Sequence, residues 1–476
     1  MSSRLFRLTI STLAIICTLS NSSRPQDSLD QQINRRFSSS QLLADLDFVV
    51  SKLSVKEYGR DPFAYVDKGA FEEAVDGARR AITKADSMTL RQFFVLAGRI
   101  IALVKDDHAS LQLSGYWARK AIQGNMFAEP ILLPLTVAIR ESTCVVIAAS
   151  GIPVGSRLLS INAMPISALI QLVLQSASFS QLNALRTGCI EYFDFPKYAI
   201  ELHALAGLKD SVLVRYIPPG QPNDVIGFIP LFRYFDRPAY AKSFQVLPFK
   251  KKPIRAVRII DSIAVISLNS FRIGKDSTDT REWLAFFDTT FKSLAEAKVS
   301  KLLIDVSENG GGAEFIGHIL LNYLWSGKFK TTYYSDELPI DSLVKISVSS
   351  RVPGFRYGEY QWRPFRGKVY VLISERTFSS AARFVDLVKS YNIGMIIGRK
   401  TRAFRSHYGE MASAQLPNTS LPFTWSTKFF VSVSGDVKPH PIEPDVTIPI
   451  TGPEDMVKIL TEDLLLTRAL DVIRSR

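Results

Sequence analysis

The sequence predicts an α/β protein of two or three domains, and three patterns lead to this class. Residues 256–476 alternate between short apolar runs of strand length and amphipathic runs of helix length, as in a mainly parallel sheet covered by helices. Residues 40–104 repeat apolar side chains at helical spacing, whereas residues 112–255 contain short β-rich runs between turn residues. The 476 residues are 46% hydrophobic and 22% charged, so the chain has enough apolar material for a substantial core.

The first 23 residues have the pattern of a secretory signal peptide. Arg4 and Arg7 precede an uncharged run over 8–19, and small polar residues follow at 20–23. A run of 12 residues is too short to cross a hydrocarbon core of about 30 Å as a helix. We therefore expect a secreted protein, periplasmic if its source is bacterial. The alternatives are a retained signal anchor or a lipid anchor at Cys17.

Residues 24–111 form the predicted helical N-terminal domain. After a polar lead-in, the last of its helical stripes starts at Thr89 and ends before Lys105-Asp106-Asp107-His108. His108 therefore falls just past a helix C-terminus, where its imidazole is a chemically plausible base. A lone histidine at such a place is also often only a favourable partner of the helix dipole.

Residues 112–255 are predicted as a β-rich insert followed by a linker. The turn, strand and helix pattern of residues 155–166 is similar to a PDZ-type segment. After the signal only two cysteines remain, Cys144 and Cys189. They either pair in an oxidising compartment or behave as two small buried hydrophobes.

Residues 256–476 form the predicted α/β core. We expect strands at 263–268, 301–306, 369–373 and 395–397, and helices at 281–297, 313–325 and 379–389. Ligands of open α/β sheets bind at the carboxyl ends of the strands. Two of these ends are chemically distinctive.

The first distinctive strand end runs from Asp305 into Gly310-Gly311-Gly312 and then into a helix. Such glycines allow close backbone approach, and amides at a helix N-terminus offer donors to a negative oxygen. The second places Ser379 between a buried strand and a helix, where its hydroxyl lies at the sheet edge beside the amide of Ser380. The alternative for Ser379 is a plain helix N-cap. The sequence carries no metal-binding or cofactor-binding motif.

These motifs together resemble the C-terminal processing (tail-specific) serine peptidase family, most closely its tricorn-type branch. Asp106-Asp107-His108, Leu303-Ile304-Asp305 with Asn309-Gly310-Gly311-Gly312, and Thr377-Phe378-Ser379-Ser380-Ala381 follow one another in that family's order. The resemblance spans nearly the whole mature chain. It implies a crotonase/Clp-like catalytic core, a helical N-terminal domain, a PDZ-like insert, and polypeptide substrates.

The resemblance implies a role for each matching residue. Ser379 is the expected nucleophile and His108 the expected general base, as in the tricorn-type branch. The amides of Ser380 and of Gly311 or Gly312 are the expected oxyanion hole. Other family members use a serine–lysine dyad, for which Lys400 is the nearest substitute here. The acid that orients His108 is unassigned, with Glu443 and Asp106 as candidates.

The sequence also departs from the family pattern, and this keeps a second function open. Ser307 stands in place of the usual arginine of the glycine motif, and Ala382 or Arg383 replaces an acidic residue after the nucleophile. The leading expectation is a secreted serine endopeptidase that forms an acyl-enzyme. The alternative is a catalytically weakened or inactive protein that binds a peptide or an apolar ligand on the same scaffold.

The net charge of +13 bears on which partners and substrates the protein binds. No nucleic-acid motif accompanies this charge, so we expect no nucleic-acid partner. Arg399, Lys400, Arg402 and Arg405 form a basic cluster after the proposed nucleophile. We expect this cluster to line the substrate approach and to favour acidic chains or a free carboxylate.

Overall fold

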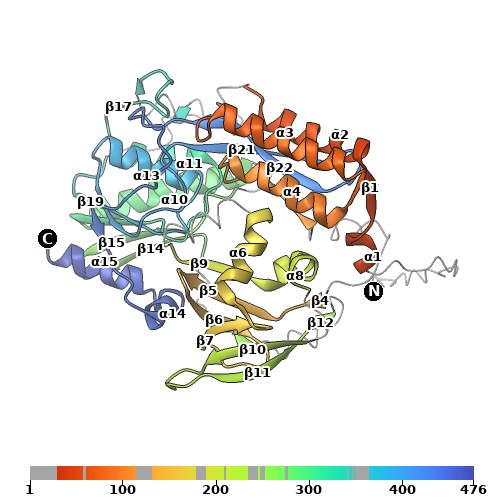
Figure 1. Ribbon diagram of the computed structural model, residues 1–476. Helices are drawn as coiled ribbons and strands as arrows, with labels where there is room; N and C mark the ends of the chain where they lie inside the picture. The colour runs from red at the N-terminus through yellow and green to blue at the C-terminus, as the bar shows by residue number, and fades with distance from the viewer. Residues whose placement is uncertain are drawn as a thin grey trace, which may run out of the picture.

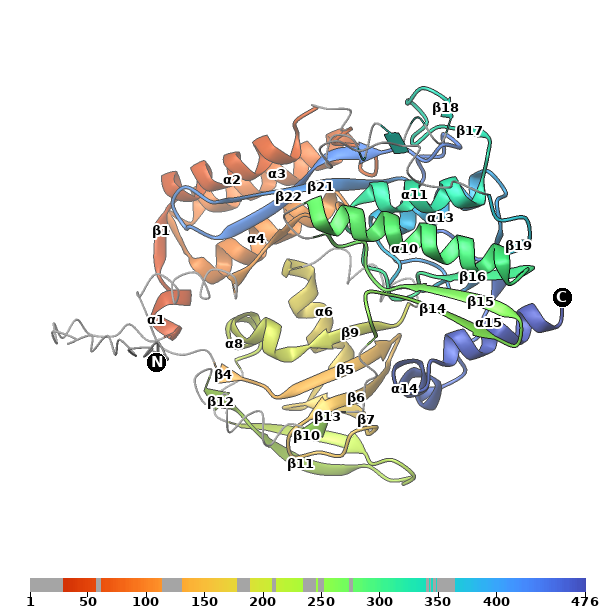
Figure 2. The same ribbon diagram turned by 180° about the vertical axis from the view of Figure 1, so that it is seen from behind.

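A computed structural model shows how the predicted elements assemble (Figures 1 and 2). It describes residues 29–56, 61–113, 131–177, 189–207, 211–233, 245–246, 252–273, 277–339 and 364–476, with a few single positions at 342–348. The predicted signal peptide and Cys17 lie outside these residues. In both views a layer with α2, α3 and α4 lies on one side of the molecule and the insert with β5–β11 on the other.

The α/β core is built on a six-stranded sheet in the order β14-β15-β16-β19-β20-β23. Every neighbouring pair is parallel except the β14–β15 hairpin. The strands are β14 (Arg255–Ile260), β15 (Ile263–Leu268), β16 (Lys301–Asp305), β19 (Lys368–Ile373), β20 (Met395–Gly398) and β23 (Val446–Thr447). A small hairpin of β17 (Lys328–Phe329) and β18 (Leu338–Pro339) lies outside the sheet.

Helices cover both faces of this sheet because strand side chains point alternately to either face. Leu302 and Ile304 of β16 pack with the core of one group of helices, while Leu303 between them packs with the core of the other. The first group is α10 (Ser277–Glu296), α11 (Glu314–Leu324) and α13 (Ser380–Ser390). The second group is α14 (Pro453–Thr461) and α15 (Leu464–Arg474).

The insert is a mostly antiparallel eight-stranded sheet with helices α6 (Ile166–Ala177) and α8 (Ala199–Ala206). Its main path runs β11-β10-β7-β6-β5-β9, with β13 and β8 paired at its side. The strands are β5 (Leu135–Arg140), β6 (Thr143–Ala149), β7 (Arg157–Ile161), β8 (Met164–Pro165), β9 (Glu191–Asp194), β10 (Ser211–Ile217), β11 (Val225–Pro230) and β13 (Gln245–Val246). A separate pair joins β4 (Ile131–Leu132) to β12 (Phe232–Arg233), and a 3-10 turn, η1, spans Phe195–Tyr198. Both Cys144 and Cys189 are buried and form no disulfide.

The N-terminal helices share one hydrophobic core with a long hairpin from the other end of the chain. The hairpin strands are β21 (His407–Gln415) and β22 (Pro422–Phe430), and β3 (Ser110–Leu111) extends their sheet. The other N-terminal elements are α1 (Leu29–Ile33), β1 (Arg36–Ser38), α2 (Ser39–Leu53), α3 (Lys68–Lys84), β2 (Ser87–Thr89) and α4 (Leu90–Leu103). Ser38 and Thr89 begin α2 and α4 with capping boxes, which fix where these helices start.

The predicted fold class is confirmed, since the molecule is a mixed α/β structure with several sheets. The strands expected in the core agree with β15, β16, β19 and β20 within one or two residues. Among the described residues, no helix is both long and apolar enough to span a membrane.

Candidate active site

The loop after β19 holds Ser379 in a strained backbone conformation. Its φ is +52° and its ψ is −127°, a region that residues with a side chain rarely occupy. Although Ser379 immediately precedes α13, its side chain makes no capping hydrogen bond to the helix. The interpretation of Ser379 as a plain N-cap is therefore wrong. A strained serine at a strand-to-helix turn is the geometry of a nucleophile elbow.

The glycine loop after β16 lies directly against Ser379. A Cβ built on Gly311 would stand 2.8 Å from the Ser379 Cβ and 3.2 Å from the Ser380 nitrogen. Only glycine fits here, because Gly311 also has a φ of +98°. Gly312 has a φ of +139°, and a Cβ there would lie 2.2 Å from the Phe271 carbonyl oxygen.

Asn309 connects the glycine loop to the nucleophile loop. The Gly311 amide donates to Asn309 Oδ1 at 2.9 Å, and Asn309 Nδ2 donates to the Leu268 carbonyl at 3.0 Å. The Asn309 carbonyl in turn accepts from the Phe378 amide at 3.0 Å. Because the Gly311 amide is already used, the oxyanion donors left from the predicted set are the amides of Gly312 and Ser380.

Strand pairing across more than 300 residues of sequence brings His108 to this site. Ser110 of β3 pairs with Thr424 of β22, and Thr424 Oγ1 donates to the His108 carbonyl at 2.7 Å. The His108 ring lies 5.2 Å, between centroids, from the ring of Phe378. Because Phe378 precedes Ser379 directly, the base candidate and the nucleophile candidate lie in the same neighbourhood.

Asp106 is the candidate acid that lies beside His108. It is fully buried, and its Oδ1 is 3.9 Å from His108 Nδ1 and accepts the His108 amide at 2.9 Å. Ser426 holds the same carboxylate through its amide at 2.9 Å and its hydroxyl at 2.7 Å. These bonds fix the position of the Asp106 carboxylate, although His108 Nδ1 has no hydrogen-bond partner among the described residues.

The surroundings of His108 favour its neutral form. Burial lowers the pKa of His108, and the positive charge of Arg402 lowers it further. The Asp106 carboxylate and the Tyr408 backbone raise the pKa in the opposite direction, without overcoming the burial. A neutral imidazole at pH 7 is the form that accepts a proton.

For the other two candidates, no hydrogen bond or ion pair to Ser379 or His108 is present among the described residues. Glu443 is exposed, and its carbonyl accepts from Lys389 Nζ at 2.7 Å, at the far end of α13. Lys400 is half-buried, and no hydrogen bond or ion pair among the described residues joins it to Ser379. Among the same residues no hydrogen bond joins Ser379 Oγ to the His108 ring, a contact that often tightens only when substrate binds.

The basic cluster after the nucleophile is largely neutralised by buried carboxylates. Arg399 Nε lies 2.5 Å from Glu375 Oε1, and Arg402 Nη1 lies 2.9 Å from Glu191 Oε2. Arg405 pairs with Asp386 in the same way. Ion pairing inside the fold therefore uses the charge of these three arginines, while the expected preference of this cluster for acidic chains or a free carboxylate stays a prediction.

Arg383, at one of the departures from the family pattern, ties the two helices of the site together. Its Nε donates to Glu314 Oε1 at 2.7 Å, and Glu314 lies in the first turn of α11, just after the glycine loop. Burial alone would raise the pKa of Glu314, but Arg383 and His318 hold it well below its usual range. Arg383 therefore has a positioning role that its place in the sequence does not reveal.

Sequence reasoning missed two residues that shape the site. They are Asn309 and Phe378. The Phe378 ring centroid lies 5.1 Å from the guanidinium of Arg402, a member of the predicted basic cluster. Asn309 belongs to the glycine motif and Phe378 to the motif around Ser379, so the sequence indicates that both lie near the site. Their contacts depend on the fold and could not be predicted from the sequence. Among the described residues no group of three or more His, Cys, Asp or Glu side chains is arranged to hold a metal ion.

Comparison with known proteins finds one matching family model and several solved structures of similar fold. Residues 262–448 match the model of Peptidase family S41. A structure of mature CPAF superposes with a TM-score of 0.56 at 16% identity, covering 90% of this chain and 96% of that one. A photosystem II D1 C-terminal processing protease gives a TM-score of 0.42 at 14% identity, covering 90% and 98%. No curated protein matches the sequence.

Proposed function

We propose that this chain is a secreted serine endopeptidase that cleaves polypeptides with Ser379 as its nucleophile, since residues 262–448 match the model of Peptidase family S41. The observation that carries the proposal is the backbone of Ser379. Ser379 keeps a φ of +52° although its side chain makes no capping bond to α13, and it lies against the glycine loop, as expected of a nucleophile that its surroundings hold in a strained conformation. Secretion rests on the signal-like pattern of residues 1–23.

In the proposed mechanism Ser379 Oγ attacks the carbonyl carbon of the scissile peptide bond. Neutral His108 takes the hydroxyl proton and then delivers it to the leaving amine. The amides of Ser380 and Gly312 stabilise the negative oxygen of the tetrahedral intermediate. Water then hydrolyses the acyl-enzyme by the same route in reverse, and the Asp106 carboxylate stabilises the charged His108 in both halves.

The first test compares Ser379→Ala with the unchanged protein on a fluorescently labelled, unfolded polypeptide. We expect kcat/KM to fall by at least about 10³-fold, because the nucleophile is gone. Ser390→Ala, at the other end of α13, is the matched control and keeps its activity. Undiminished cleavage by Ser379→Ala would refute the proposal.

The second test identifies the base. His108→Ala is expected to lose activity together with labelling by a serine-reactive phosphonate, while Lys400→Ala keeps both. The opposite result would assign the proton transfer to Lys400 and leave His108 with a structural role.

The alternative, a binding protein on the same scaffold, has one observation in its favour. His108 Nδ1 is buried without a hydrogen-bond partner and stands 3.9 Å from Asp106, which is beyond hydrogen-bond distance. The phosphonate probe separates the two functions, because a binding protein leaves Ser379 unlabelled.

A further inference from the structure

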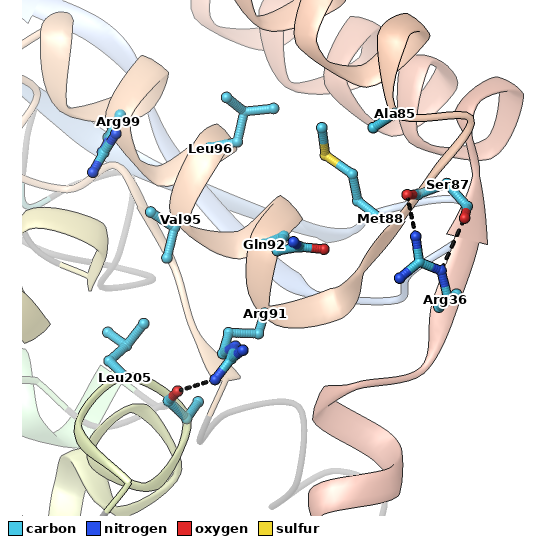
Figure 3. A pocket seen from close by; sticks show the side chains of 11 residues that line it. Arg36, Ala85, Ser87, Met88, Arg91, Gln92, Val95, Leu96, Arg99 and Leu205 are labelled. Atoms are coloured by element: carbon cyan, nitrogen blue, oxygen red, sulfur yellow. Dashed lines mark hydrogen bonds between the residues drawn. The ribbon is translucent and has the colours of Figure 1, made fainter.

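A pocket with a cavity volume of about 520 Å³ lies between the N-terminal helices and the insert (Figure 3), and Ser379 is not among the residues that line it. Its walls come from β1 and β2, the N-terminal part of α4, and the last turn of α8. Three exposed arginines line it, namely Arg36, Arg91 and Arg99. We call it the arginine pocket.

The arginine pocket carries positive charge that no carboxylate offsets. None of its lining residues is acidic, and no ion pair among the described residues involves its arginines. Within the part of the chain that the structure describes, Arg36 donates to Ser87, to Oγ at 2.9 Å and to the carbonyl at 2.7 Å, and Arg91 donates to the Ala204 carbonyl at 3.2 Å. These neutral partners orient the two guanidinium groups, as Figure 3 shows, and leave their charge available to an anion.

The surface between the arginines is apolar. Met88, Val95, Leu96 and Leu205 line the pocket and pack against the largest hydrophobic core while remaining partly exposed. A ligand that fits both features has an apolar middle with a negative group at each end.

The spacing on α4 specifies the ligand further. Arg91 and Arg99 are eight residues apart, which corresponds to about 12 Å along a helix, and Val95 stands between them on the same face (Figure 3). An extended peptide advances about 3.3 Å per residue, so carboxylates three or four residues apart match these guanidinium groups.

We propose that the arginine pocket is a docking site for an acidic–apolar–acidic segment of polypeptide substrates. The inference deepens the proposed peptidase function, on which it rests. Helix α4 leads directly to His108, so a chain held here is tethered close to the catalytic centre without occupying it. The chain's own segments 1–28 and 114–130 contain more Arg and Lys than Asp and Glu, and therefore do not complement the pocket.

The test is fluorescence anisotropy with a labelled, end-blocked peptide of sequence Gly-Glu-Leu-Ser-Leu-Glu-Gly. The full chain carrying Ser379→Ala serves as the binding partner, so no cleavage occurs and binding is read independently of catalysis. We expect saturable binding that weakens about tenfold in Arg99→Gln and further in Arg91→Gln with Arg99→Gln. Arg99 makes no hydrogen bond or ion pair among the described residues, so its loss should leave the fold intact.

Two controls make the result decisive. Arg80→Gln removes an exposed arginine of α3 outside the pocket and should bind the peptide like the parent protein. The same peptide with Gln in place of both Glu residues should bind at least tenfold more weakly. Equal binding of the Glu peptide to the parent and to the double arginine variant, or equal binding of the Gln and Glu peptides, would overturn the docking site. Failure of the peptidase proposal is recognised separately, by cleavage that does not depend on Ser379.

Discussion

The contact between Gly311 and Ser379 makes a sharp prediction about catalysis. In Gly311→Ala the new Cβ would lie 2.8 Å from the Ser379 Cβ and 3.0 Å from the Phe378 carbonyl oxygen. Ordinary contact begins at about 3.4 Å, so the two loops must separate by about 0.6 Å. The φ of +98° adds backbone strain for any residue other than glycine.

The expected loss follows from these distances. A displacement of about 1 Å at a reacting group typically costs about 10²-fold in rate, and loss of an oxyanion donor costs about 10²–10³-fold. Since the Cβ also approaches the Ser380 nitrogen, we expect kcat/KM of Gly311→Ala to fall by about 10²-fold or more. The strain should lower the free energy of unfolding by about 1–3 kcal/mol.

Gly310→Ala is the matched control. It introduces the same methyl group one residue earlier, where no atom lies within 4 Å and where φ is not positive. The assay is the initial rate of cleavage of the labelled polypeptide, measured beside a urea unfolding curve for each variant. If Gly310→Ala and Gly311→Ala lost activity equally, or if neither did, the close approach of Gly311 to Ser379 would have no catalytic importance.

Three further variants test the surroundings of the site. Asn309→Ala removes the acceptor of the Gly311 amide, so we expect kcat/KM to fall by roughly 10- to 100-fold. Unchanged activity would contradict a positioning role for Asn309. Asp106→Asn removes the negative charge that raises the pKa of His108, so the acid limb of the kcat/KM–pH profile should move to lower pH. A shift to higher pH would contradict the assignment of His108 as the base beside Asp106. Burial, Arg383 and His108 lower the pKa of His407 from 6.5 to about 3, so the folded protein binds fewer protons than the unfolded one between these values. The free energy of unfolding that His407 contributes is therefore fully present above pH 6.5 and falls as the pH decreases toward 3, by about 1.4 kcal/mol per pH unit. The urea midpoint of His407→Asn should depend less on pH in this window than that of the unchanged protein.

Local patterns were sufficient to predict much of the core. The strands of the α/β sheet and Ser379 at a strand-to-helix turn follow from short apolar runs and punctuating residues, which depend only on neighbours in sequence. The strained conformation of Ser379 was not predictable in this way. The surrounding loops, above all Asn309 and Gly311, impose it.

The roles of charged residues required the tertiary structure. Arg399 and Arg405 belong to a basic cluster in the sequence, and in the fold each meets a buried carboxylate from another element. Conversely, Arg91 and Arg99 attract no attention in the sequence, and it is the tertiary structure that places them, exposed and without an ion pair to any described residue, in one pocket with β1, β2 and α8. Pairing of charges depends on which elements become neighbours, and sequence distance carries little information about that.

By itself the sequence determined the α/β class, the order of the core elements, and two loops capable of supplying a nucleophile and an oxyanion hole. The tertiary structure decided that Asp106, and not Glu443, lies beside His108, and that the Gly311 amide is already occupied. It also brought His108 to the nucleophile loop through the pairing of β3 with β22. The physical reason is that periodicity and turn chemistry act over a few residues, whereas this site closes through hydrogen bonds and ring contacts between segments some 270 to 320 residues apart.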